Sequence, residues 1–202
     1  MTTKTLMRTS DLENCSREST QPVGVGEIGR FISILKRHAN QSGDARQRSR
    51  KVLVEYINFS PNSQLLINEL IMTCIGMKCP ERLDIAIDVL SGVGGAIANY
   101  AYTYLQTDIQ QWSKLYPNEK FKPTDDYWYV LLRSVGKCSG NPDKRFQVLS
   151  VCQDEPARGV AESVVEGLAD LGTPKAIAVL NGLANNHPDR FIQKLARELL
   201  EF

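Results

Sequence analysis

The chain contains little histidine and no excess charge of either sign. His38 and His187 are its two histidines, and 24 Lys and Arg residues stand against 23 Asp and Glu residues, for a formal net charge of +1. A catalytic site that depends on histidine therefore has few candidate residues. A near-neutral chain also has no overall attraction to nucleic acid or to an anionic membrane. We therefore expect a protein that is not an enzyme, and any anionic partner must be met by a local patch.

No apolar run is long enough to cross a membrane or to direct secretion. The stretch from Val89 to Leu105 is interrupted by Gly92, Gly94, Gly95 and Asn99. It falls short of the roughly 20 apolar residues that a span needs, and a buried helix or helix pair explains it better. We therefore expect no membrane span.

The five cysteines are too few and too scattered for a disulfide framework or a zinc site. Their number is odd and no signal peptide precedes them, which favours reduced thiols and a cytoplasmic protein. Cys74 and Cys79 have a C-x4-C spacing, but Cys74 stands on an apolar helix face, where a free cysteine behaves as a small core residue. We expect no metal or other cofactor.

Prolines divide the chain into short helices. Proline is favoured at the first position of a helix because its φ suits the helix and its missing N–H would be unpaired there. Six of the nine prolines stand where a helix could begin, namely Pro61, Pro80, Pro142, Pro156, Pro174 and Pro188. No segment shows the sustained alternation of a strand. The sequence therefore predicts an all-α fold, with helices near residues 27–40, 44–58, 61–75 and 80–93 in the N-terminal half.

The C-terminal half repeats its pattern. The interval from Pro142 to Pro174 is equal to the interval from Pro156 to Pro188. Each helix between these prolines is too short to be stable alone, so it must bury its apolar stripe against its neighbours. We predict an α-solenoid of stacked short helical hairpins over residues 27–202, clearest over 125–202, after a flexible tail at 1–26. Residues 27–95 keep no such register, so degenerate repeats and an unlike helical cap both stay open.

One helix of this half carries a clear apolar face. Its members are Val160, Ala161, Val164, Val165, Leu168 and Leu171, with Glu162, Glu166 and Asp170 opposite. The stretch from Val160 to Ile177, VAESVVEGLADLGTPKAI, resembles the HEAT-like repeat of phycobilin lyase subunits and related cyanobacterial proteins. The resemblance implies a HEAT-like solenoid in the C-terminal half and a role in handling phycobiliproteins or their bilins.

A basic window interrupts the otherwise balanced charge. Between Arg30 and Lys51 seven cations accompany a single acid, Asp44, which gives a local charge of +6. The candidate patch for an anionic partner consists of Arg37, Arg46, Arg48, Arg50 and Lys51. A solvated rim of ordinary helices is the alternative. Nucleic-acid binding by this window is expected to be weak, non-specific and sensitive to salt.

Aromatic residues are concentrated between Tyr100 and Tyr129, where nine rings lie within thirty residues. Interface centres are enriched in Tyr and Trp, and the stripes of one or two short helices cannot bury so many rings. The candidate partner-binding residues are Tyr100, Tyr104, Trp112, Trp128, Asp125 and Asp126. Residues 115–124, which contain two prolines, are expected to form an extended connection.

Three functions are consistent with these features. The leading expectation is a non-catalytic protein-binding scaffold or adaptor on HEAT-like repeats. The resemblance implies a second, a phycobilin lyase-like or phycobiliprotein chaperone subunit. The third is a HEAT-like DNA glycosylase, a family whose pocket resembles an arrangement of Trp, Asp and Arg. The candidate residues for such a pocket here are Trp112, Trp128, Asp125, Asp126, Arg133 and Arg145. The near-neutral charge argues against this third function.

Overall fold

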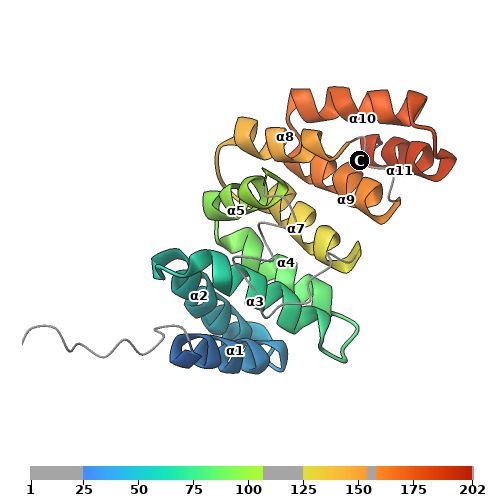
Figure 1. Cartoon of the computed structure of the whole chain (residues 1–202). Coiled ribbons are helices and arrows are strands. Elements are labelled where there is room, and N and C mark those ends of the chain that lie inside the picture. Colours follow the sequence, from blue (N-terminus) through green and yellow to red (C-terminus); the bar gives the residue numbers. More distant parts are fainter. Residues whose placement is uncertain (1–24, 107–124, 154–157, 202) are drawn as a thin grey trace, which may run out of the picture.

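The computed structural model describes residues 25–106, 125–153 and 158–201, and this part of the chain is entirely helical (Figure 1). Its helices are α1 (Val25–Ala39), α2 (Gly43–Phe59), α3 (Ser63–Ile75), α4 (Arg82–Gly92), α5 (Gly95–Gln106), α7 (Asp125–Lys137), α8 (Pro142–Val151), α9 (Arg158–Leu171), α10 (Pro174–Asn186) and α11 (Arg190–Leu200). The predicted all-α class is confirmed for these ranges, which contain no strand. None of these helices is both long enough and apolar enough to span a bilayer.

The helices pack in a regular order along the chain. In one row α2 packs on α4, α4 on α7, α7 on α9 and α9 on α11, while α1 packs on α3 and α5 on α8. Consecutive helices such as α1 and α2, or α10 and α11, also pack on each other. Figure 1 shows the result as a succession that runs from α1 at one end to α10 and α11 at the other. The buried apolar residues form one continuous core from Phe31 to Ala196.

The helix starts confirm part of the proline pattern. α8 and α10 begin at Pro142 and Pro174, and the side chains of Asn141 and Thr173 cap them by accepting hydrogen bonds from backbone N–H groups. α11 begins at Arg190, and the described part of α9 begins at Arg158.

The other predicted starts need correction. Pro188 does not open α11, because the side chain of Asp189 accepts a hydrogen bond from the backbone N–H of Phe191 at 2.7 Å and so caps the helix one residue later. Pro61 and Pro80 likewise lie two residues before α3 and α4. Pro156 and residues 1–24 of the predicted tail lie outside the described ranges. Val25 and Gly26, assigned to the tail, belong to α1.

α9 is enclosed by its neighbours, and its predicted apolar face is confirmed. All six residues of that face are buried, because α9 packs on α7, α8, α10 and α11. Its contact with α7 is so close that both helices need glycine. A Cβ at Gly136 of α7 would overlap the carbonyl oxygen of Gly167 and lie 2.8 Å from its Cα, and a Cβ at Gly167 would lie 3.0 Å from the carbonyl oxygen of Leu132.

Arginine–carboxylate pairs join each helix of the α2–α4–α7–α9–α11 row to the next. In every pair the arginine belongs to the earlier helix. The pairs are Arg50–Asp88 (2.9 Å), Arg82–Asp126 (3.3 Å), Arg133–Glu166 (2.6 Å) with Arg133–Asp170 (3.1 Å), and Arg158–Asp189 (3.8 Å). Half-exposed pairs contribute little stability each. Arg133, whose side chain is 17% exposed, is the most enclosed of these arginines.

We predict that Gly136→Ala lowers the free energy of unfolding by about 2 kcal/mol or more, because the added methyl group meets the backbone of α9, which cannot rotate away. Urea unfolding monitored by circular dichroism measures the change. Gly182→Ala is the matched control, since nothing lies within 4 Å of its Cβ position in α10. Alanine also favours a helix over glycine there by up to about 1 kcal/mol. Equal stability of the two variants would contradict the close contact.

Candidate functional site

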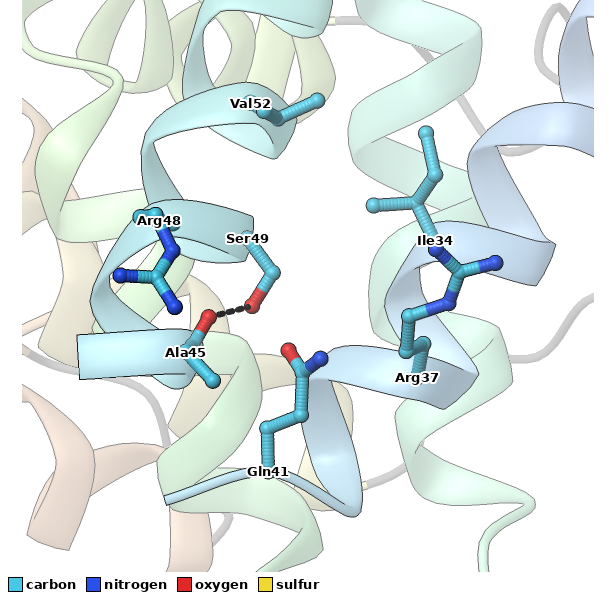
Figure 2. Close-up of a pocket in the computed structure, with 7 residues that line it drawn as sticks. All are labelled: Ile34, Arg37, Gln41, Ala45, Arg48, Ser49 and Val52. Atoms are coloured by element: carbon cyan, nitrogen blue, oxygen red, sulfur yellow. Dashed lines mark hydrogen bonds between the residues drawn. The ribbon is translucent and has the colours of Figure 1, made fainter. Parts of the chain in front are cut away.

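An open hollow lies between the first two helices. Its volume is about 340 Å³. The residues that line it are Ile34, Arg37 and Gln41 from α1 and the turn after it, and Ala45, Arg48, Ser49 and Val52 from α2. Figure 2 shows Arg37 and Arg48 on opposite sides of the opening, with the Gln41 side chain between them. Apolar side chains and two guanidinium groups therefore surround one cavity.

The hollow belongs to the side of this helix pair that faces away from the rest of the protein. Leu53 and Ile57 of α2 point into the core, and Arg50 pairs with Asp88 of α4. Ala45 and Val52 lie on a different side of α2, because helical spacing separates them from those residues by about 80° to 160°. Val52 is 43% exposed.

The exposed apolar surface of α2 continues beyond the hollow. Ala45, Val52 and Phe59 follow one another at intervals of seven residues, so they share one side of the helix. Phe59 is 84% exposed, the highest value among the large apolar side chains of the described ranges. A large ring on the surface suggests a contact that the isolated chain does not make.

The predicted basic patch is divided between two places. Arg37 and Arg48 flank the hollow, whereas Arg46 and Arg50 line a second hollow of about 330 Å³ with Gly43, Gln47 and Asp88. Two members of the patch are neutralised, because Arg50 pairs with Asp88 at 2.9 Å and Lys51 with Glu55 at 3.8 Å.

Five other cations of α1 and α2 form no ion pair with an acid in the described part of the chain. They are Arg30, Lys36, Arg37, Arg46 and Arg48. Positive charge therefore remains available on this helix pair.

A buried histidine separates the two hollows. His38 is completely buried, its Nδ1 lies 2.9 Å from the Ser49 hydroxyl, and its Nε2 lies 3.9 Å from an Asp88 carboxylate oxygen. Burial lowers the pKa of His38, the positive charge of Arg46 lowers it further, and Asp88 opposes both. In the sequence, His38 stands out only because histidine is scarce. Its spacing of three and seven residues from Leu35 and Phe31 could have placed it on the buried face of α1.

The structure corrects one predicted aromatic anchor. Tyr100 is 2% exposed, and its hydroxyl lies 2.6 Å from that of Tyr127, which donates to the Asn68 side chain at 3.1 Å. The hydrogen bonds explain the error, because a tyrosine whose hydroxyl has partners can enter the core. Tyr100 is thus a core residue of α5 and not an exposed ring.

The remaining predicted partner-binding residues lie near the start of α7 or outside the described ranges. Trp128 is half-buried and packs against the core, and Asp126 pairs with Arg82 of α4. The side chains of Tyr104 and Asp125 and the whole of Trp112 lie outside the described part, as does the predicted connection at 115–124. Their role in binding stays a prediction.

Arg133 and Arg145, considered for a base-binding pocket, hold α7 to its neighbours. Arg133 pairs with Glu166 and Asp170 of α9. Arg145 of α8 donates to the carbonyl oxygens of Val135 and Gly136 at the end of α7. Both guanidinium groups therefore contribute to the packing of the helices.

We predict that His38 makes the fold sensitive to acid. Its pKa in the folded protein lies below the ordinary value of 6.5, so the unfolded chain binds the proton more readily. Stability should therefore fall as the pH drops below about 6.5 and stop falling below the folded pKa. His38→Gln should lose less unfolding free energy than the wild type between about pH 7 and pH 5.5 in urea titrations. His187→Gln, which leaves His38 in place, should behave as the wild type does.

Comparison with known proteins assigns the chain to no family. No protein-family model matches it, and a search of curated proteins finds no match.

Proposed function

We propose that this protein is a non-catalytic scaffold of stacked HEAT-like helical hairpins that binds another protein through the outer side of α1 and α2. One observation carries the proposal: an apolar hollow, flanked by Arg37 and Arg48, lies open on the first helix pair. Apolar surface beside unpaired arginine is typical of the centre of a protein interface.

The order of the helices supports the stacked arrangement. Each helix of the row from α2 to α11 packs on the next. In such a stack every hairpin contacts only its neighbours, so the outer sides of the first and last hairpins lack one. Terminal hairpins usually carry polar side chains there to remain in solution.

The two ends of this protein differ in that respect. The last helix pair exposes mainly polar side chains, Asn181, Asn185, Lys194, Arg197 and Glu198 among them. Its large exposed apolar residues are Ile177 and Phe191, and the guanidinium of Arg158 lies 4.0 Å from the centre of the Phe191 ring. The first pair instead exposes Val52 and Phe59 beside the hollow. We infer that a partner covers the first end.

We predict that the double variant Arg37→Glu/Arg48→Glu loses partner binding while it keeps its fold. The tagged full-length chain is crosslinked in native extract treated with nuclease, and captured proteins are quantified by mass spectrometry. Reversal of two charges at an interface should reduce capture of a specific partner at least about tenfold. Melting temperature should change little, because neither arginine has an ion pair to lose among the described acids.

Arg190→Glu is the control, since it reverses one charge on an exposed residue at the opposite end of the protein. Capture should survive in this variant. Equal capture by the wild type and the double variant would show that the partner binds elsewhere. Capture of no protein would contradict the scaffold itself.

A further inference from the structure

We propose that the element bound by the first helix pair is an amphipathic α-helix with acidic residues beside its apolar stripe, seated lengthwise along α2. This inference rests on the proposed function and names the chemistry of its partner. Shape, charge and one unsatisfied polar atom support it independently.

The shape of the surface fits a helix. Ala45, Val52 and Phe59 form a straight stripe whose fourteen-residue length corresponds to about 21 Å, or four helical turns. Ile34 of α1 and Gln41 of the turn after it border the same hollow. Intervals of seven residues are typical of surfaces against which a second helix packs. Elsewhere in this protein the corresponding contacts of a helix are made by the next helix of the row.

The charge of the surface fits an acidic helix. Arg37 and Arg48 stand on opposite sides of the hollow, so a helix in the groove has a guanidinium on each flank. Carboxylates three or four residues apart on each side of its apolar stripe would meet them. Arg30 and Lys36 of α1 add further positive charge. α2 has two acids, namely Asp44, which lies next to Ala45, and Glu55, whose charge is matched by Lys51.

One polar atom of the hollow is incomplete without a ligand. The Oε1 atom of Gln41 is buried and has no hydrogen-bond partner in the described part of the chain. A buried acceptor without a donor costs free energy that a bound N–H or O–H group would recover. The Gln41 side chain lies between the two arginines that flank the hollow.

Two other occupants fit less well. The N-terminal residues 1–24 directly precede α1, but Lys4, Arg8 and Arg17 balance Asp11, Glu13 and Glu18, so this segment has no net negative charge to match the arginines. Nucleic acid would satisfy the arginines, yet its phosphate backbone offers no apolar surface for Val52 and Phe59. An acidic amphipathic helix satisfies both features.

The test uses a labelled helical peptide of about 20 residues, with leucine at positions a and d of each heptad and glutamate beside them. The control is the same peptide with lysine in place of every glutamate. Fluorescence anisotropy with the full-length chain should give a dissociation constant in the micromolar range for the glutamate peptide and at least about tenfold weaker binding for the lysine peptide.

Three variants locate the site. Arg37→Glu/Arg48→Glu should weaken binding of the glutamate peptide at least about tenfold and strengthen binding of the lysine peptide. Arg190→Glu should change the affinity for neither peptide. Val52→Asn changes no charge, and it should weaken binding of both peptides if the bound helix packs on the apolar stripe. Circular dichroism on each variant checks that the fold is retained.

The outcomes separate this inference from the scaffold function. Absence of binding by the glutamate peptide, or binding that the double charge reversal leaves unchanged, overturns the acidic helix. If the double variant nevertheless loses its partner from native extract, the scaffold function stands with a partner of another shape. If the glutamate peptide binds only after residues 1–22 are deleted, the chain's own N-terminal segment occupies the groove, and the inference is wrong.

Discussion

The contact between α7 and α9 is the constraint on which the other helices depend. Gly136 and Gly167 let the two backbones approach more closely than any side chain permits, and Arg133 fixes the pair in register by contacts with Glu166 and Asp170. A glycine in a helix costs about 1 kcal/mol relative to alanine, so two of them at one crossing indicate a packing requirement. Because α4 packs on α7 and α11 on α9, this crossing orients helices on both sides.

The same row explains why the candidate site is at one end. Along the row, α4, α7, α9 and the N-cap of α11 each receive an arginine from the preceding helix of the row, and these pairs neutralise carboxylates between the helices. α2 has no predecessor in the row. Because no earlier helix of the row covers α2, Arg48 borders an open hollow, and it forms no ion pair with an acid in the described part of the chain.

Much of the helical pattern follows from local chemistry. Pro142 and Pro174 start helices because a capping side chain immediately precedes each, and the buried face of α9 follows from its spacing alone. The prediction that Pro188 opens a helix is wrong because the side chain of Asp189 caps α11 one residue later. The spacing of the prolines does not reveal this cap. The prediction that Tyr100 is an exposed anchor is wrong because its hydroxyl is part of a buried hydrogen-bond network. The other members of that network are Tyr127 of α7 and Asn68 of α3, which are distant from Tyr100 in sequence.

The sequence by itself determined the all-α class, the starts of α8 and α10 and the location of excess positive charge, because each depends on the order and spacing of residues along the chain. Only the tertiary structure decided which cations stay unpaired and which apolar residues stay exposed. Arg50 and Arg48 are two residues apart, yet one meets Asp88 of α4 and the other borders the open hollow. That difference depends on which side of α2 a neighbour covers, and contacts between distant segments set it.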